Sequence, residues 1–402
     1  MTATLVWLLI AGPAWSLVGA LALPRRYRAR GLDPRLAPLV GGVVGAATGP
    51  LGVGLLYILL PELRRGRHVA LPSLLLAAEL AALFRASFPS NVCVTSPSYV
   101  LDQVQNGLTL GMVYATIAVG LTLVFSVQGI VSFAHGQFFL LGGVLSFLLL
   151  THVWDANPVY AIPVAGAVTL VVGMAFERGM LGPIHGARVE RPAEYAILVT
   201  FGFGMFLQYA LVGLMGSPRG VKSPRYTERP ILGIDDPTLA IGSIRVRTDL
   251  LIAGLIGLLL ILCLHWFLRR TWMGMSLRAV AMDRDAAAAV GIDTGRAFTA
   301  AFGIGSMLAG MSGAALVPAL TFPVPQMASQ AALRSYVVIV LGGLGSVPGA
   351  LLGGLFVGAV EALGAGCYPD PSRGAVYQPA FSLLIFALVL LVRPRGFFGR
   401  KG

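Results

Sequence analysis

Long apolar stretches separated by short polar joins run along almost the whole chain. Most are long enough for an α-helix that crosses the ~30 Å hydrocarbon layer of a bilayer, which takes about 18 or more residues. The short alternating segments of a transmembrane β-barrel are missing. The pattern therefore predicts an all-α polytopic membrane protein, with apolar segments at residues 5–23, 39–60, 69–87, 103–127, 133–150, 159–176, 196–215, 250–268, 297–317, 334–344, 347–365 and 379–392.

Basic residues gather in some of these joins, and their placement predicts the orientation of the chain. Lys and Arg collect in short cytoplasmic loops of membrane proteins. Residues 177–195, residues 269–296 and the end of the chain after residue 392 are rich in arginine, so we expect all three on the cytoplasmic side. The long loop 216–249 then lies outside, where four acidic residues balance its basic ones.

Charge and hydropathy disagree at one place in the N-terminal part. Basic joins at 24–38 and 61–68 flank the segment 39–60, and both can be cytoplasmic only if that segment does not cross the membrane. Its middle reads AATGPLG, which breaks a helix. A re-entrant hairpin and a plain crossing both stay open. We divide the chain into an N-terminal membrane extension, residues 1–95, with two further spans, and a core, residues 96–402.

Two polar joins that contain glycine interrupt the apolar pattern of the core. Residues 126–137 and 342–349 each connect two apolar runs, and three prolines within 318–326 break the approach to the second join. Broken helices at corresponding positions of two halves point to a translocation site near the middle of the membrane. The halves are roughly 103–215 and 250–392, although their sequences are too dissimilar to establish a repeat.

Composition narrows the function. Hydrophobic residues make up 56% of the chain and charged residues 11%, and the mean hydropathy is +0.82, whereas a soluble domain carries about 25% charged residues. The net charge of +12 comes from short arginine clusters between apolar runs. A basic helix interleaved with aromatic residues is missing, so we expect no nucleic-acid partner. The motifs HExxH, CxxC and GxSxG are also missing, so we expect no catalysis on this chain.

The chain has three cysteines, Cys93, Cys263 and Cys367. They are too few and too scattered for a metal site or a disulfide framework. Cys93 and Cys367 both fall in loops that the charge pattern places outside, so a single disulfide between these two stays open.

Three motifs in the core are similar, in order and spacing, to those of a known family. They are residues 106–115 (NGLTLGMVYA) with 133–136 (FAHG), residues 277–285 (LRAVAMDRD) with 290–293 (VGID), and residues 340–350 (VLGGLGSVPGA) with 361–363 (EAL). Together with the ending 393–400 (RPRGFFGR), they make about three-quarters of the chain resemble the LivH-type branched-chain amino acid permeases of ATP-binding-cassette (ABC) importers. The first hundred residues have no counterpart in a standard member.

The resemblance implies a type II-like importer fold and several partners. These would be a second permease subunit, two cytoplasmic ATPase subunits that hold ATP and Mg²⁺, an extracytoplasmic substrate-binding protein and membrane lipids. The chain itself would carry no cofactor and no metal. It would be a multi-pass protein of the bacterial plasma (inner) membrane with its C-terminus in the cytoplasm. Relatives carry branched-chain amino acids, urea, short amides or carboxylates, so the family does not name the substrate.

The second motif contains a short helix that resembles the coupling helix of such permeases. Asp283 is a natural N-cap and Gly291 a natural stop, which predicts a helix over 284–290. A solvated charged loop without such a role is the alternative. The residues assigned to ATPase coupling are Arg278, Asp283, Arg284, Asp285 and Gly291.

The residues assigned to the translocation path lie in the first motif and around the two broken joins. They are Asn106, Tyr114, His135, Gln137, Gly342, Gly343, Gly345 and Ser346. Unwound backbone at membrane depth either lines a cavity or is buried in protein, so residues 342–348 either contact substrate or pack. His135 either lines the path or fixes a helix junction by a hydrogen bond to nearby backbone. Gln137 stands where family members often carry a carboxylate, which argues against a proton- or cation-linked role there.

Two functions remain in competition. The leading hypothesis is the permease subunit of an ABC importer for a small polar solute, above all branched-chain or related amino acids. The alternative is a stand-alone secondary transporter or channel for a solute such as urea or an amide. That alternative calls for an ionisable site within the membrane, and only His135 and Glu361 stand out in the core. Glu361 is either a rim contact with the binding protein or half of a structural pair.

Overall fold

The computed structural model divides the chain into two compact units, Met1–Ser96 and Pro97–Gly402, and each is described by itself. The extension predicted for residues 1–95, including the question of whether 39–60 crosses the membrane, lies outside the described residues except for the short helix α6 (Val92–Thr95). The structure describes residues 91–153, 156–185, 189–215, 223–228, 236–241, 244–320, 325–369, 371–392 and 396.

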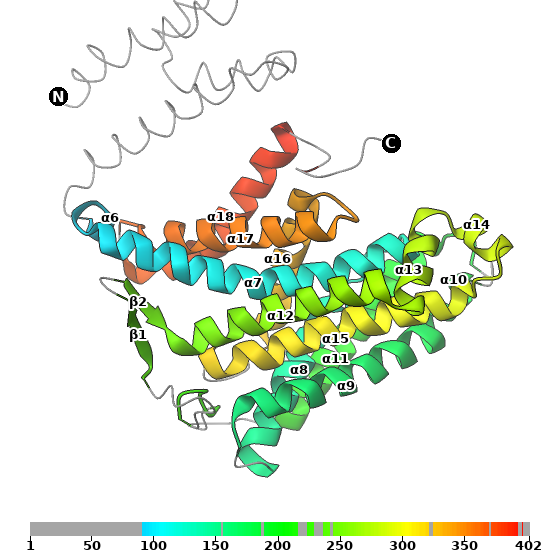
Figure 1. The fold of residues 1–402 in the computed structure, drawn as a ribbon, viewed down its shortest axis with the longest axis horizontal. Helices are drawn as coiled ribbons and strands as arrows, with labels where there is room; N and C mark the ends of the chain where they lie inside the picture. The colour runs from blue at the N-terminus through cyan, green and yellow to red at the C-terminus, as the bar shows by residue number, and fades with distance from the viewer. Residues whose placement is uncertain are drawn as a thin grey trace, which may run out of the picture. The chain divides into compact units, whose positions relative to one another are not determined.

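The unit Pro97–Gly402 is a bundle of helices (Figure 1). Eight of the described helices are long and apolar enough to cross a membrane, which confirms the polytopic all-α prediction. The helices are α7 (Pro97–Gln128), α8 (His135–Leu148), α9 (Ala161–Phe176), α10 (Gly182–His185), α11 (Pro192–Met215), α12 (Thr248–Arg270), α13 (Trp272–Met282), α14 (Arg284–Ala289), α15 (Thr294–Leu320), α16 (Gln326–Gly342), α17 (Val347–Gly366) and α18 (Pro371–Val392).

Short π-helical and 3-10 turns extend two of these helices. Leu149–Val153 continues α8, Pro158–Tyr160 precedes α9, and Glu177–Leu181 joins α9 to α10. The two strands among the described residues, β1 (Thr238–Ile241) and β2 (Ile244–Arg247), form an antiparallel pair that the sequence did not predict. Figure 1 shows β1 and β2 at one end of the bundle and α10, α13 and α14 at the other.

Each apolar segment predicted from residue 103 onward coincides with a helix, but two began eight residues too late. The segment 379–392 belongs to α18, which begins at Pro371. The segment 334–344 belongs to α16, which begins eight residues earlier, at Gln326. The polar side chains of Gln326, Ser329 and Gln330 interrupt the apolar pattern there, and all three residues are exposed. The hydropathy pattern therefore missed the first two turns of a helix whose outer face is polar.

Two sets of helices repeat the same packing. Helix α7 packs along α17 as α15 packs along α9, and the short helices α8 and α16 pack against α15 and α7 respectively. In addition, α8 contacts α9 and α11, and α16 contacts α17 and α18. The set α7, α8, α9 and α11 thus corresponds to α15, α16, α17 and α18. Helix α12, which packs on α7 and α15, is additional to the repeat.

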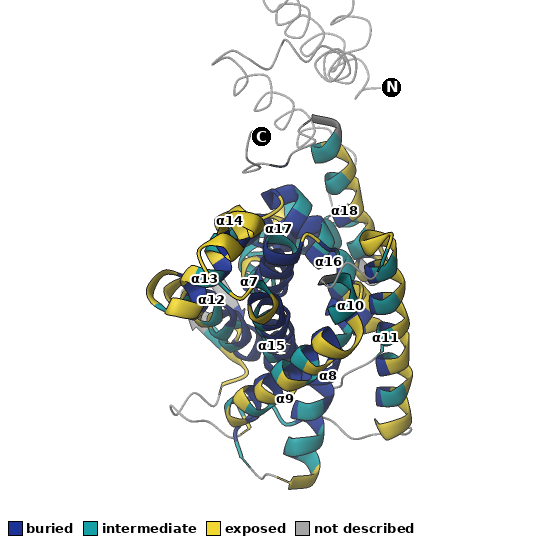
Figure 2. Cartoon of the chain, turned by 90° about the vertical axis from the view of Figure 1, so that its right-hand side faces the viewer, coloured by how far each residue is buried: buried dark blue, intermediate teal, exposed yellow. Residues whose placement is uncertain are grey.

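Buried residues gather where α7, α8, α15 and α16 face one another, whereas the outer faces of α11 and α12 are exposed (Figure 2). Small residues allow the closest contacts, because without a side chain two helix backbones can approach each other. On α7, a Cβ atom added at Gly111 would lie 2.6 Å from the carbonyl oxygen of Gly354 in α17. Gly354 and Gly358 of α17 therefore pack closely against α7.

Replacing Gly111 by alanine should destabilise the bundle. The added methyl group would overlap backbone of α17, and overpacking of this kind costs about 1–3 kcal/mol. Gly213→Ala is the matched control, because a Cβ atom there has nothing within 4 Å. Thermal unfolding in detergent should give a lower Tm for Gly111→Ala and an unchanged Tm for Gly213→Ala. Equal Tm values for both variants would contradict the close contact.

Candidate functional site

The first broken join leads from one end of the bundle to its middle. Helix α7 ends at Gln128, the next residue, Gly129, has a positive φ of 71°, and α8 begins at His135. The His135 ring is buried, and its Nε2 lies 3.0 Å from the carbonyl oxygen of Ile117, which lies well inside the 32-residue helix α7. Because a carbonyl only accepts, Nε2 donates. His135 thus makes the helix-junction contact that was one of its two interpretations.

Side chains of two neighbouring helices hold the start of α8. The amide N–H of Phe133 donates to the Thr200 hydroxyl of α11 at 3.1 Å, and the Gln137 amide donates to Oε1 of Gln208 at 3.1 Å. The Tyr336 hydroxyl of α16 donates to the Ser132 carbonyl at 2.7 Å. Gln137 therefore joins α8 to α11, and its own Oε1 is buried without a hydrogen-bond partner.

The second broken join lies near the end of the bundle. Gly343 and Gly345 have φ values of 98° and 86°, and Ser346 caps α17 by accepting a hydrogen bond from the amide of Gly349 at 3.1 Å. A Cβ atom at Gly345 would lie 3.4 Å from the hydroxyl of Ser126, which is close to the C-terminal end of α7. The structure thus confirms that the helices break at both joins. Only the first of the two joins reaches the middle of the bundle. Gly342 and Gly343 are buried.

The other predicted path residues lie apart from these joins. Asn106 is half-buried near the start of α7, where its carbonyl accepts a hydrogen bond from Thr109 at 2.9 Å. Tyr114 is buried further along the same helix and belongs to a polar network of its own. The structure therefore brings His135 and Gln137 together, and Gly342, Gly343, Gly345 and Ser346 together, but it does not join all eight residues into one site.

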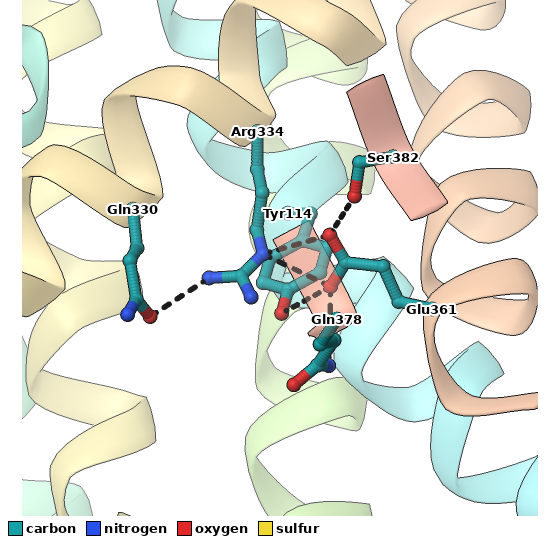
Figure 3. A network of polar contacts seen from close by, with 6 residues as sticks. All are labelled: Tyr114, Gln330, Arg334, Glu361, Gln378 and Ser382. Carbon is teal, nitrogen blue, oxygen red and sulfur yellow. Dashed lines mark hydrogen bonds and ion pairs between the residues drawn. The ribbon is translucent and has the colours of Figure 1, made fainter. Parts of the chain in front are cut away.

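Around Glu361 of α17, polar side chains from four helices meet (Figure 3). Arg334 of α16 donates through Nε to both carboxylate oxygens, at 3.0 and 2.9 Å. The hydroxyl of Tyr114 in α7 and the amide of Gln378 in α18 each donate at 3.2 Å, and the Ser382 hydroxyl of α18 donates as well. Four donors therefore surround one carboxylate, and they tie α7, α16, α17 and α18 together.

Burial explains why this carboxylate needs so many donors. The Glu361 side chain is fully buried and the Arg334 side chain is only 9% exposed. An unpaired charge in such a place is very unfavourable, so buried charges are paired and hydrogen-bonded. The guanidinium also lies over the Tyr114 ring, 5.0 Å from its centre, and its Nη1 donates to Oε1 of Gln330 at 3.1 Å. Glu361 is thus half of a structural pair, and the alternative of a rim contact is wrong.

The sequence overlooked two ionisable residues of the core. Arg334 was placed at the edge of a span, because the polar first turns of α16 hid the true start of that helix. Glu177 was placed in a cytoplasmic loop, but it is buried beside α15 and accepts a hydrogen bond from Thr299 at 2.5 Å. Extending the predicted helices, backward from residue 334 and forward from residue 176, would have placed both residues inside the core.

The predicted coupling helix forms as expected. The Asp283 side chain caps α14 by accepting from the amides of Asp285 and Ala286 at 3.0 Å each, and Gly291 has a positive φ of 86° just after the helix. Arg278 is exposed on α13. The helix ends at Ala289, one residue before the predicted end.

Arg284 differs from the expectation of a side chain directed only at a partner. Its Nη2 donates to the Gln128 carbonyl at the end of α7 at 3.1 Å, and its guanidinium lies 4.6 Å from the centre of the Phe298 ring in α15. The Gln128 side chain in turn donates to the Phe298 carbonyl at 2.9 Å. Arg284 therefore ties α14 to the point where the first broken join begins.

Most of the chain matches a known protein family. A model of the family described as branched-chain amino acid transport system / permease component matches residues 103–393. The chain belongs to this permease family. The permease is 32% identical to the high-affinity branched-chain amino acid transport system permease protein LivH of Escherichia coli (strain K12) over 310 residues, which is 75% of this chain and 96% of LivH.

Other relatives extend the match. The permease is 31% identical to the corresponding permease protein BraD of Pseudomonas aeruginosa over 311 residues, again 75% of this chain and 96% of the relative. It is 26% identical to the permease protein LivM of Escherichia coli (strain K12) over 265 residues, which is 59% of this chain and 58% of LivM. No solved structure gave a significant match to the chain. The resemblance found in the sequence motifs is thereby confirmed.

Removing one member of the buried pair should destabilise the permease strongly. Glu361→Gln leaves the Arg334 guanidinium buried without its counter-charge, which costs about 3–5 kcal/mol. The double variant Arg334→Met, Glu361→Leu should recover much of that loss, because an apolar pair of similar volume needs no counter-charge. Thermal unfolding in detergent measures both effects.

The matched control is Glu194→Gln in the exposed ion pair with Arg191, whose side chains are 65% and 76% exposed. Exposed pairs of this kind contribute little, so its Tm should stay unchanged. If Glu361→Gln unfolds at the same temperature as Glu194→Gln, the buried pair does not hold the four helices together.

Proposed function

We propose that this permease is the membrane-spanning subunit of an ATP-driven importer for a branched-chain or related amino acid. The capped helix α14, with the surface around it, is the observation that carries the proposal beyond family membership. The relatives LivH, BraD and LivM supply the substrate class, since each is named as a permease protein of branched-chain amino acid transport.

The segment α13–α14 has the surface that a partner subunit would need. Met282, at the end of α13, is 78% exposed, and Val290, which caps α14, is 77% exposed. Large apolar side chains on both sides of a charged, capped helix are typical of a docking surface. We assign this surface to a cytoplasmic ATPase subunit, which would hold the ATP and Mg²⁺. This chain would then need no cofactor of its own.

Charge and cysteine chemistry support the orientation. The end of the bundle that carries α10, α13 and α14 is the end with the arginine-rich joins (Figure 1), which favours the cytoplasm. Cys367 is disulfide-bonded, whereas Cys263 is a free, exposed thiol. Disulfides persist in oxidising compartments, so Cys367, at the end of α17, favours an extracytoplasmic position. Helix α18 would then bring the C-terminus to the cytoplasm of a bacterial inner-membrane protein.

The remaining partners follow from the same proposal. LivH and LivM are both named as permease proteins of high-affinity branched-chain amino acid transport. A second permease subunit beside this chain is therefore expected. An importer of this kind also takes its solute from an extracytoplasmic substrate-binding protein. The path residues Asn106, Tyr114, His135 and Gln137 and the second broken join remain candidates for contact with solute.

The ionisable residues of the core give the alternative of a secondary transporter no support. Glu361 is already matched by Arg334 and by three neutral donors, so it offers no open site for a coupling ion. Glu177 accepts a hydrogen bond from Thr299. An energy source on a separate ATPase fits these enclosed carboxylates better.

Co-purification and uptake test the proposal together. The tagged chain should co-purify from membranes with an ATPase. In vesicles whose ATPase faces the lumen, the reconstituted complex should import radiolabelled L-leucine only when the lumen contains ATP. A chain that purifies alone, and that keeps its uptake when residues 277–296 are scrambled, would sink the proposal.

Arg284→Ala should reduce ATP-driven uptake while the complex still assembles. The variant loses a charge-assisted hydrogen bond between α14 and the end of α7, a contribution of about 1.5–3 kcal/mol, so we expect uptake to fall about tenfold. The control is Arg296→Ala, which removes the same charge from an exposed pair with Asp293. Equal uptake by the two variants would show that the contact with α7 has no role in coupling.

A further inference from the structure

The guanidinium of Arg334 has one edge that the Glu361 network does not use. Its Nε donates to Glu361 and its Nη1 donates to Gln330. Its Nη2 has no hydrogen-bond partner among the described residues. This nitrogen is also not among the fully buried polar atoms that lack a partner, so it keeps some accessible surface. Since Glu361 is fully buried and the Arg334 side chain is 9% exposed, the pair is open on the arginine side only.

That open edge lies beside a polar stripe on α16. Gln326, Ser329 and Gln330 are exposed, and they follow one another at intervals of three and one residues on the same side of the helix. The other faces of α16 pack on α7, α8, α17 and α18. Exposed polar side chains inside a membrane bundle face a water-filled path or another subunit and not lipid. The stripe therefore leads solute-accessible surface to Arg334.

Gln330 completes the donor set at this edge. Its Oε1 accepts the hydrogen bond from Arg334 Nη1, which fixes the orientation of the carboxamide and leaves its amide nitrogen as an outward donor (Figure 3). Arg334 Nη2 and Gln330 Nε2 are thus two N–H donors on adjacent turns of one helix. Two N–H donors, one of them on a cation, suit an anionic group with two oxygens.

The Glu361 carboxylate does not fully neutralise the charge on Arg334. The Glu361 carboxylate shares its charge among the hydroxyls of Tyr114 and Ser382 and the amide of Gln378, besides Nε of Arg334. The outer edge of the planar guanidinium can therefore still attract a carboxylate, and planar guanidinium groups match carboxylates well. Because Glu361 offsets part of the charge, a bound carboxylate would be held weakly enough to move on, as transport requires.

We propose that Arg334 Nη2 and Gln330 Nε2 form a subsite that receives the carboxylate of the transported solute. This rests on the proposed function, and it deepens that proposal by naming the residues that receive the carboxylate of the amino acid. The network around Glu361 holds the guanidinium in place before solute arrives, so little side-chain freedom is lost on binding. Arg334 is thereby both a structural residue of the bundle and a contact for solute.

Gln330→Glu tests the subsite in the complete reconstituted complex. The new carboxylate would stand beside the free edge of Arg334, remove the Gln330 amide donor and repel a solute carboxylate, so ATP-driven uptake of L-leucine should fall about tenfold or more. Gln330 is exposed, so the variant should assemble and unfold like the wild type. Gln326→Glu is the matched control: it makes the same change on the same stripe, one turn earlier, and uptake should stay within about twofold of the wild type.

The outcomes separate the subsite from the proposed function. Unchanged uptake by Gln330→Glu, or an equal loss in Gln326→Glu, overturns the subsite and leaves the importer in place. A wild-type complex that imports urea or acetamide with ATP, but not L-leucine, overturns both the subsite and the amino acid assignment of the proposed function, and keeps only the ATP-driven importer. If none of the three probes is imported with ATP, the proposed function fails and the subsite falls with it.

Discussion

A helix inside a bilayer can stop only where neighbouring groups take up its free backbone amides and carbonyls, because no lipid atom can do so. The first broken join meets this constraint at three backbone groups. The carbonyl of Gln128, where α7 ends, accepts from Arg284, and the Ser132 carbonyl in the connection accepts from Tyr336. The amide of Phe133, just before α8, donates to Thr200. Side chains from three other helices therefore make the break possible, and the arrangement of α8 and α16 within the bundle depends on them.

Charge imposes a second, related requirement within the bundle. Around Glu361, four donors from three helices enclose a single carboxylate, so the network sets how α7, α16, α17 and α18 pack. Among the described residues, the outer edge of Arg334 is the part of the network that keeps accessible surface. Arg334 thus stabilises the bundle and is also the cation that a solute can reach. Ionisable side chains within a membrane are energetically unfavourable, so those that are present usually have a function.

The two regions are connected through α16. Tyr336, which holds the first broken join at Ser132, lies two residues after Arg334 on the same helix. At the other end of the join, the Gln128 carbonyl accepts a hydrogen bond from Arg284 of α14. Contacts therefore run without interruption from the proposed ATPase-docking surface to the helix that carries the proposed solute contact. A rigid shift of α14 would displace the start of the first join, where Gly129 allows the backbone to turn.

Sequence alone determined the features that depend on local chemistry: the helices, because hydropathy reports the bilayer directly; both breaks, because glycine and proline act on their own backbone; and the cap of α14 by Asp283, because that contact spans three residues. Tertiary structure decided what depends on partners far apart in the chain. Arg334 and Glu361 meet across 27 residues, and Arg284 and Gln128 across 156. No local pattern encodes such a pairing, since it exists only once the helices have packed.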